Sequence, residues 1–293
     1  MVEKKNEKKL LDNLAMIPGF MLAEEAAERE RLNALGCKYS FGDKVIDDYC
    51  GGGWGRYEAY DIICVFGGTG MNKSTLVSQM AISPARKGDK VAYLALEDEM
   101  VDVYNRMKRQ MQPTGISSNE EFKKVMQNVH FMSNNSGYYL SSMINTVEEL
   151  FKIYDVIIMD PVQFVFEASI VDKGESEVNR QRIFMQKLHD VVVKAKKPLV
   201  FVSHTNKSVY DKNSKTDDLG QMLGSLGLPQ ICSKVIKIHR DKDGIRTVSF
   251  PKARFTQERH NSLQVSLDKN SLRVYFDRTG LTQKQIMDME ANW

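Results

Sequence analysis

The sequence is poor in cysteine and has no long apolar run, and both absences exclude classes of protein. The cysteines lack Cys-x-x-Cys spacing, which argues against a disulfide framework or a structural zinc site and predicts reduced thiols. No apolar stretch approaches the ~18 residues of a membrane span. The N-terminus lacks the uncharged apolar core of a signal peptide and is too acidic for a transit peptide. We therefore expect a cytoplasmic protein. The four cysteines are Cys37, Cys50, Cys64 and Cys232.

The net charge is also small, and at +3 it does not by itself argue for nucleic-acid binding. The charge is unevenly distributed, because Ser203 to His260 hold eleven Lys and Arg against six Asp and Glu. Such an excess fits contacts to phosphate groups, and it fits a solvated surface equally well. The length of 293 residues suits one large α/β domain with short extensions, or at most two small domains.

One glycine-rich stretch organises the rest of the chain. It follows an apolar run, Ile62 to Phe66, and precedes a helical pattern. A buried strand, a glycine-rich turn and a helix form the context of a phosphate-binding loop, whose backbone N–H groups converge on phosphate oxygens. Lysine adds a mobile ammonium, and serine offers a hydroxyl to Mg²⁺. We expect this stretch to bind a nucleoside triphosphate; the alternative is an ordinary glycine turn. Its residues are Gly67, Gly68, Thr69, Gly70, Met71, Asn72, Lys73, Ser74 and Thr75.

One position departs from the usual phosphate-binding pattern. Asn72 stands just before Lys73, where the pattern has glycine. Asparagine tolerates left-handed backbone angles better than most residues, so we expect the loop to close as usual. The departure places a side chain where the nucleotide comes close.

Short apolar runs alternate with helical patterns after the loop, which predicts a mostly parallel sheet with helices on both faces. Beyond Gly220, alternating strands predict antiparallel hairpins that extend the sheet, with a turn at Asp243-Gly244. The predicted strands after the loop are Val91–Leu96, Val129–Met132, Val156–Met159, Pro198–Val202, Lys234–Arg240, Arg246–Ala253, Leu263–Leu267 and Leu272–Phe276. The predicted helices are Val101–Met111, Glu120–Gln127, Ser142–Tyr154 and Glu175–Lys196.

Two acidic residues follow predicted core strands. Ligands of open parallel sheets gather at the carboxyl ends of the strands, so Glu97 should face the γ-phosphate, where a carboxylate can orient water and accept its proton. An acidic loop that caps the next helix is the alternative. Asp160 ends the run Val156 to Met159, as in a Walker B motif, and is expected to hold Mg²⁺ directly or through water. Gln163 is a candidate polar relay or a helix cap.

A polar pair, Ser203 and His204, ends another predicted core strand. His204 could donate a hydrogen bond to the γ-phosphate, although a lone histidine is more often structural. The lysine-bearing segment Asn206 to Lys215 that follows could be a DNA-contacting loop or a plain surface loop.

The N-terminal 35 residues predict a short helical arm. Apolar residues at helical spacing between Leu10 and Ile17 are followed by a break at Pro18-Gly19 and then by a second amphipathic segment. The arm could pack on its own domain or on a neighbouring subunit. We favour the neighbour, because a terminal helix ahead of a complete core has little of its own surface left to cover.

Taken in order, these signals resemble the RecA-type motor domain of ring-shaped replicative DNA helicases, the DnaB-like superfamily. Within that group the sequence looks more like phage primase-helicases and mitochondrial Twinkle than bacterial DnaB. The resemblance covers roughly Tyr39 to Asp277. It rests on the loop Gly67 to Ser74, on Ala95-Leu96-Glu97, on Ile157-Ile158-Met159-Asp160, on Val202-Ser203-His204, on Met222-Leu223-Gly224-Ser225-Leu226-Gly227 and on Lys252-Ala253-Arg254-Phe255-Thr256.

The resemblance implies a role for each matching position. Lys73 and Ser74 would bind ATP, or another NTP, with Mg²⁺, which Asp160 supports. Glu97 would activate water, and His204 would sense the γ-phosphate. Arg254 would reach into the neighbouring subunit's site, where a guanidinium fork can meet transition-state charge; a surface arginine is the alternative. The residues that would line a DNA channel are Lys207, Lys212, Lys215, Gly224 and Ser225.

The resemblance also implies an organisation and a setting. We expect an N-terminal helical arm or linker at residues 1–38, a RecA-like ATPase motor domain at 39–280 and a C-terminal tail at 281–293. The chain has no primase or zinc-binding region, so priming would come from a separate protein, with a polymerase or loader as further partners. The setting would be the cytoplasm of a bacterial or phage-infected cell.

The sequence thus predicts an ATP-driven, Mg²⁺-dependent motor that forms a ring, expected to be a hexamer, on single-stranded DNA and separates duplex. One rival is a RecA/RadA-like recombination ATPase that forms filaments and exchanges strands. The other is an adaptor or loader that binds ATP and a helicase but barely hydrolyses, which Asn72 makes conceivable and which retention of Glu97 argues against.

Overall fold

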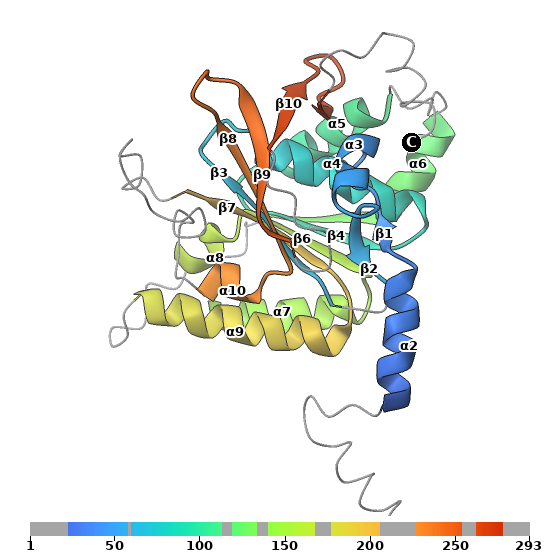
Figure 1. Cartoon of the computed structure of the whole chain (residues 1–293), viewed down its shortest axis with the longest axis vertical. Coiled ribbons are helices and arrows are strands. Elements are labelled where there is room, and N and C mark those ends of the chain that lie inside the picture. Colours follow the sequence, from blue (N-terminus) through green and yellow to red (C-terminus); the bar gives the residue numbers. More distant parts are fainter. Residues whose placement is uncertain are drawn as a thin grey trace, which may run out of the picture.

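The fold is built on one large sheet with helices on both faces (Figure 1). The structure is a computed structural model, and it describes residues 23–57, 60–112, 119–133, 140–167, 177–205, 227–253 and 262–277. Predicted features outside these ranges include the first N-terminal helical segment and the C-terminal tail. Among the described residues, no helix combines the length and the apolar character needed to cross a membrane.

The main sheet has nine strands in the order β11-β10-β9-β8-β3-β7-β6-β4-β5. The six strands from β8 to β5 run parallel, and β9, β10 and β11 add an antiparallel extension. The predicted fold class is therefore confirmed. The strands are β3 (Ile62–Gly67), β4 (Val91–Ala95), β5 (Val129–Ser133), β6 (Val156–Asp160), β7 (Leu199–His204), β8 (Lys234–Arg240), β9 (Arg246–Ala253), β10 (Leu263–Leu267) and β11 (Val274–Phe276).

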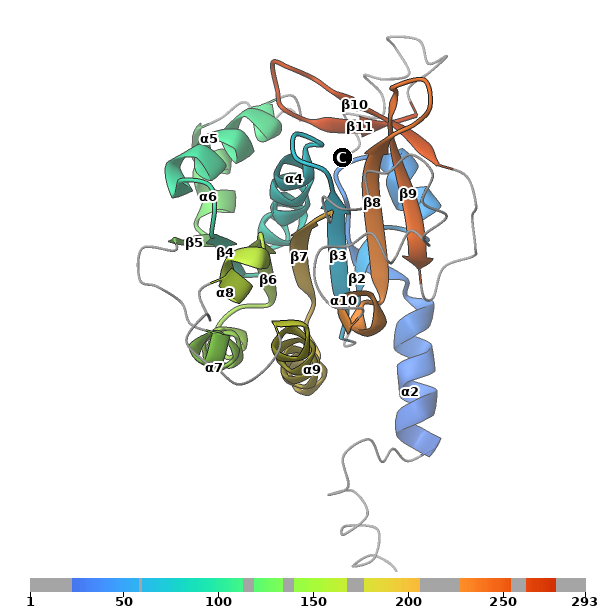
Figure 2. The ribbon, with the colours of Figure 1, turned by 90° about the vertical axis from the view of Figure 1, so that its left-hand side faces the viewer.

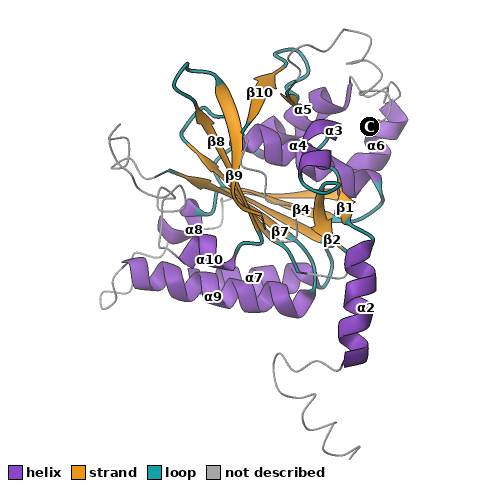
Figure 3. Ribbon diagram, viewed as in Figure 1, coloured by secondary structure: helices purple, strands orange, loops and turns teal. Residues whose placement is uncertain are grey.

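Helices cover the two faces of the sheet (Figure 3). Because successive strand residues point to opposite faces, the central strands feed two separate apolar clusters. Ile63 and Val65 of β3 pack on the side of α3–α6, whereas Ile62 and Cys64 pack on the side of α7–α10. The helices on the first side are α3 (Lys44–Tyr49), α4 (Lys73–Arg86), α5 (Met100–Met111) and α6 (Asn119–Met126). Those on the second are α7 (Leu140–Phe151), α8 (Gln163–Glu167), α9 (Glu177–Ala195) and α10 (Gly227–Ile231).

Several predicted boundaries differ from the structure by one to three residues, and two of them differ for identifiable reasons. The helix predicted to reach Lys196 ends at Ala195, because Lys196 has a positive φ of 53°. The last strand, predicted from Leu272, begins at Val274, because Leu272 has a φ of 57° and closes a turn onto Asp268. Left-handed backbone angles interrupt both a helix and a strand, and a lysine or a leucine in the sequence does not indicate such an angle.

The glycine-rich segment before β3, whose structure the sequence did not predict, forms a small second sheet. Its strands, β1 (Cys37–Tyr39) and β2 (Trp54–Arg56), pair antiparallel and enclose α3. Gly53 is required there, because a Cβ atom would lie 2.1 Å from the carbonyl oxygen of Tyr39. The strands have three residues each, too few for an alternating pattern to be recognised.

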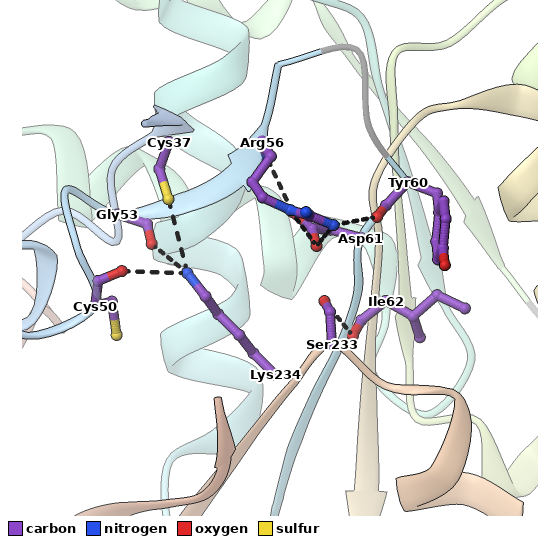
Figure 4. A network of polar contacts seen from close by, with 9 residues as sticks. All are labelled: Cys37, Cys50, Gly53, Arg56, Tyr60, Asp61, Ile62, Ser233 and Lys234. Carbon is purple, nitrogen blue, oxygen red and sulfur yellow. Dashed lines mark hydrogen bonds and ion pairs between the residues drawn. The ribbon is translucent and has the colours of Figure 1, made fainter. Parts of the chain in front are cut away.

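A buried lysine joins this small sheet to the main one (Figure 4). Lys234 of β8 is 3% exposed, and its Nζ donates to the carbonyl oxygens of Gly53 at 2.8 Å and Cys50 at 3.4 Å. Nearby, the Arg56 guanidinium pairs with Asp61 at 3.1 Å, just before β3. These contacts fix the entry to the strand that carries the glycine-rich loop.

The described part of the N-terminal arm is helix α2 (Ala23–Ala34), which extends away from the sheet in both ribbon views (Figures 1 and 2). Ala26 and Ala27 are exposed. An alanine face without cover in the single chain is compatible with packing on a neighbour, which stays a prediction.

Candidate nucleotide-binding and catalytic site

The glycine-rich loop connects β3 to α4 near the middle of the sheet. β3 lies between β7 and β8, and Gly67 is level with His204 on one side and Ile238 on the other. A Cβ atom on Gly67 would lie 2.2 Å from the Ile238 carbonyl oxygen, so the close approach of β8 requires glycine. The loop therefore starts at the carboxyl edge of the sheet, where ligands of parallel sheets bind.

Asn72 closes the loop in the left-handed conformation, as predicted. Its φ of 68° and ψ of 31° place it at the N-cap of α4, where its side chain makes no capping bond. Its Nδ2 is buried and has no hydrogen-bond partner among the described residues. The substitution for glycine thus leaves the backbone path unchanged but adds an unsatisfied donor.

The side chain of Lys73 folds back onto the backbone of the loop. The side chain is buried at 6% exposure, and Nζ donates to the Gly68 carbonyl oxygen at 3.0 Å. Burial lowers the pKa of Lys73, and the carboxylates of Asp160 and Glu97 oppose that shift. The ammonium is thus held beside the loop backbone, within the electrostatic reach of both acids.

Asp160 ends β6 and is held by two hydroxyl groups. Oδ1 accepts a hydrogen bond from Ser74 Oγ at 3.1 Å, and Oδ2 accepts one from Tyr93 OH at 2.8 Å. Burial raises the pKa of Asp160 to about 6, although both hydroxyl bonds act to lower it. The site therefore combines a buried carboxylate with the first turn of α4.

Tyr93 is a residue that sequence reasoning missed. It lies in the middle of β4 and is fully buried, so its hydroxyl needs a partner. The available signal is a lone tyrosine within an otherwise apolar core strand. Which acceptor it meets depends on the register of β4 against β6, which places Ala95 opposite Asp160.

A partly buried arginine on α5 was also missed. Arg106 donates to the Asp98 carboxylate at 2.5 Å, and its positive charge contributes to lowering the pKa of Asp160. This arginine therefore partly offsets the cost of keeping a carboxylate buried there.

Glu97 and His204 face each other at the same edge. The Glu97 carboxylate is 53% exposed and lies 3.8 Å from His204 Nε2. Burial and the neighbouring Lys73 charge lower the pKa of His204, and Glu97 opposes the shift. His204 is therefore neutral at pH 7 and can either donate or accept a hydrogen bond.

Gln163 links the two adjoining strand ends, and its role as a polar relay stays a prediction. Its Nε2 donates to Ser203 Oγ at 2.7 Å, while its Oε1 is buried without a partner among the described residues. Gln163 also begins α8, directly after the turn that follows Asp160. The residue thus connects the end of β6 to the end of β7.

The residues present fit a nucleotide with a divalent cation. Among the described residues no group of three or more His, Cys, Asp or Glu could hold a metal by itself. A buried carboxylate paired with a hydroxyl at 3.1 Å supplies two oxygen ligands, and Mg²⁺ commonly takes the others from phosphate and water. The unsatisfied Asn72 Nδ2 is a further donor at this loop.

Several predicted site residues lie outside the described ranges. The structure therefore brings together the loop, Glu97, Asp160 and His204, but it does not place the predicted inter-subunit arginine or the DNA-contacting residues. Those residues are Arg254, Lys207, Lys212, Lys215, Gly224 and Ser225.

Comparison with solved structures identifies the fold. A KaiC-like protein from the hyperthermophilic archaeon Pyrococcus horikoshii OT3 is 15% identical, with a TM-score of 0.60 over 82% of this chain and 99% of that one. A second solved structure, an isolated ATPase domain, is 13% identical, with a TM-score of 0.63 over 85% of this chain and 96% of that one. At such identities the likeness shows a shared RecA-like fold and no more.

Sequence comparison identifies the family. No curated protein matches the chain significantly. The family model described as an AAA domain matches residues 53–209, a range that holds the glycine-rich loop, Glu97, Asp160 and His204. Because this match covers more than half of the chain, the protein belongs to the AAA domain family, and its core is the RecA-like ATPase fold that the sequence resemblance predicts.

Proposed function

We propose that this protein is a Mg²⁺-dependent nucleoside triphosphatase that works as a ring-forming DNA helicase of the phage type. The observation that carries the proposal is the convergence of Lys73, Asp160 and the Glu97–His204 pair around one glycine-rich loop. Membership of the AAA domain family supports triphosphatase activity.

The loop and its helix would bind the triphosphate. Backbone N–H groups of residues 68–74 and the N-terminal end of α4 favour negative charge there. Lys73 would exchange its bond to the Gly68 carbonyl for one to a phosphate oxygen. When bound, Mg²⁺ neutralises charge on the outer phosphates, and Asp160 and Ser74 are the residues that would hold it.

Glu97 would act on the attacking water. Its carboxylate is half exposed at the carboxyl edge of the sheet, so it can reach a water molecule, orient it and accept its proton. Neutral His204, 3.8 Å from the Glu97 carboxylate, has a single N–H, which can donate to a phosphate oxygen. Loss of the γ-phosphate would then change the environment of His204 at the end of β7.

The motor part of the proposal rests on the sequence resemblance. Arg254 would complete a neighbour's site, so that hydrolysis depends on ring assembly. The segment that contains Lys207, Lys212 and Lys215, with Gly224 and Ser225, would contact the phosphates of one DNA strand without reading bases. Residues 1–38, which include α2, would join neighbouring subunits, residues 39–280 would be the motor and 281–293 a tail.

The deciding experiment measures nucleotide hydrolysis and strand separation on forked duplexes with a 5′ or a 3′ tail. Lys73→Ala should abolish both activities, and Lys124→Ala, which removes an exposed lysine on α6, should change neither. Arg254→Ala should lose turnover while the isolated subunit still binds nucleotide. Normal turnover of Lys73→Ala would sink the assignment.

One observation favours the alternative function of an adaptor or loader. The buried, unsatisfied Nδ2 of Asn72 lies in the loop itself and could weaken nucleotide binding. Nucleotide binding without DNA-stimulated turnover, and without unwinding of either fork, would favour the adaptor. Helical filaments on single strands, in place of closed rings, would favour a recombination ATPase.

A further inference from the structure

The β8–β9 hairpin lies against the glycine-rich loop on the side away from the acidic residues. β8 runs parallel to β3 and extends past it, since Gly67 is level with Ile238 and β8 continues to Arg240. Figure 2 shows the hairpin at the same end of the sheet as the loop between β3 and α4. The hairpin is therefore built into the wall of the proposed nucleotide site.

Arg246, the first residue of β9, contacts the loop directly. Its Nη2 donates to the Gly70 carbonyl oxygen at 3.3 Å, across 176 residues of sequence. Its Nε is buried without a hydrogen-bond partner among the described residues. Arg240 is opposite Arg246 in the antiparallel register, and its own guanidinium donates to the Gly244 carbonyl oxygen at 2.7 Å.

No carboxylate of the described residues forms an ion pair with Arg246. In the turn that joins the two strands, Asp241 Oδ1 accepts bonds from the backbone N–H groups of Asp243 and Ile245. Burial and the neighbouring Arg240 charge both lower the pKa of Arg246. Within the described part of the chain, this guanidinium has no carboxylate to offset its desolvation.

There is room for an anion beside this arginine. Gly70 is exposed, and a Cβ atom built on it would meet nothing within 4 Å. The surface of the loop that Arg246 contacts is thus open in the chain.

The strand order determines which part of a nucleotide would lie there. Glu97, Asp160 and His204 follow β4, β6 and β7, all on one side of β3, and the hairpin is on the other. A triphosphate whose γ-phosphate faces the acidic side must extend its nucleoside end away from that side.

We propose that Arg246 binds the α- and β-phosphates of the nucleotide held by its own subunit and so determines nucleotide affinity, not the rate of hydrolysis. The proposal rests on the proposed function. It assigns a role in cis that differs from that of Arg254, which would act on a neighbour. The Gly70 contact holds the guanidinium in place, and its remaining donors meet the phosphates.

The test is equilibrium binding of ADP and of a non-hydrolysable ATP analogue. Loss of a charge-assisted contact should raise both dissociation constants of Arg246→Ala by the same factor, about 10- to 100-fold. Because ADP lacks the γ-phosphate, an equal loss excludes a contact to that group and places it on the part that both ligands share. The turnover rate at saturating ATP should stay within about threefold of wild type. Lys242→Ala removes an exposed lysine from the tip of the same hairpin and should bind both ligands normally.

A second variant separates binding from bracing of the loop. Arg246→Gln keeps an amide donor for the Gly70 carbonyl but removes the charge, so it should bind nucleotide as weakly as Arg246→Ala. Wild-type affinity in Arg246→Gln would overturn the proposal, as would normal ADP binding with turnover lost.

The outcomes also separate this inference from the proposed function. If wild type binds nucleotide and Lys73→Ala does not, while both Arg246 variants bind normally, only the role of Arg246 fails. If wild type binds no nucleotide, the proposed function itself fails.

Discussion

Replacing Asp160 by asparagine should stabilise the metal-free protein while abolishing its activity. The side chain is only 4% exposed, and burial raises its pKa from 3.8 to about 6. A carboxyl group whose pKa is higher in the folded than in the unfolded state binds more protons when folded. Its contribution to stability is therefore most favourable below pH 3.8 and is lost as the pH rises through about 6.

The size of the effect follows from that shift. One pKa unit corresponds to about 1.4 kcal/mol, so keeping Asp160 ionised at pH 8 costs roughly 3 kcal/mol of unfolding free energy. Asparagine avoids this cost but offers one carbonyl acceptor to two hydroxyl donors, Tyr93 and Ser74. The net gain of Asp160→Asn at pH 8 should therefore be about 1–3 kcal/mol.

Thermal or urea unfolding in EDTA at pH 4 and pH 8 measures this gain. The variant should match wild type at pH 4 and exceed it at pH 8, by a few degrees in melting temperature for a chain of this size. Asp102→Asn, which changes an exposed acid on α5, should show no such gain. Adding Mg²⁺ with ADP should stabilise wild type more than the variant. A variant less stable than wild type at pH 8 without metal would refute the reasoning.

Three further substitutions test neighbouring groups. Tyr93→Phe removes the 2.8 Å bond that lowers the pKa of Asp160. The apparent affinity for Mg²⁺, measured from turnover, should fall about 10- to 100-fold, and it should fall more at pH 6.5 than at pH 8. An equal loss of affinity at both pH values would contradict this. Glu97→Gln should lower the turnover rate about 10²- to 10⁴-fold and leave ADP binding unchanged, as rapid-quench and titration experiments would show. Asn72→Gly removes the unsatisfied Nδ2, and glycine adopts the left-handed φ of this position without strain. Nucleotide affinity should therefore rise or stay equal. A large loss of affinity would mean that the Asn72 amide contacts the ligand.

The features that the sequence predicts well are those set by local pattern. The bounds of β8, β9 and β10 agree with the predicted ranges, because alternation and the Asp243-Gly244 turn determine them within a few residues. The loop and the strand-end acid Asp160 are likewise local signals. Their shared edge follows from parallel strand order, which the alternation of strands and helices implies.

The contacts that the sequence could not predict join residues far apart in the chain. Tyr93 meets Asp160 across 67 residues, and Arg246 meets Gly70 across 176. Both depend on which strands are neighbours and on their register, and one residue of slippage would turn either side chain to the other face. The burial of Lys234 was unpredictable for the same reason. A lysine in a strand normally indicates an exposed position, but here Nζ donates to two backbone carbonyl oxygens and one thiol from a distant part of the chain.

The strand order also relates the two halves of the proposed site. The hydrolytic residues follow strands on one side of β3, and Arg246 lies in the hairpin on the other, so a bound nucleotide would contact both. Since β9 leads from Arg246 to Ala253, directly before Arg254, the hairpin that contacts the loop is also the element that leads to the predicted inter-subunit arginine. Both ends of β9 pair with β8, with a register irregularity between Val235 and Lys237. In the proposed ring, occupancy of one subunit's loop would thereby bias the position of Arg254, which we propose completes the neighbour's site.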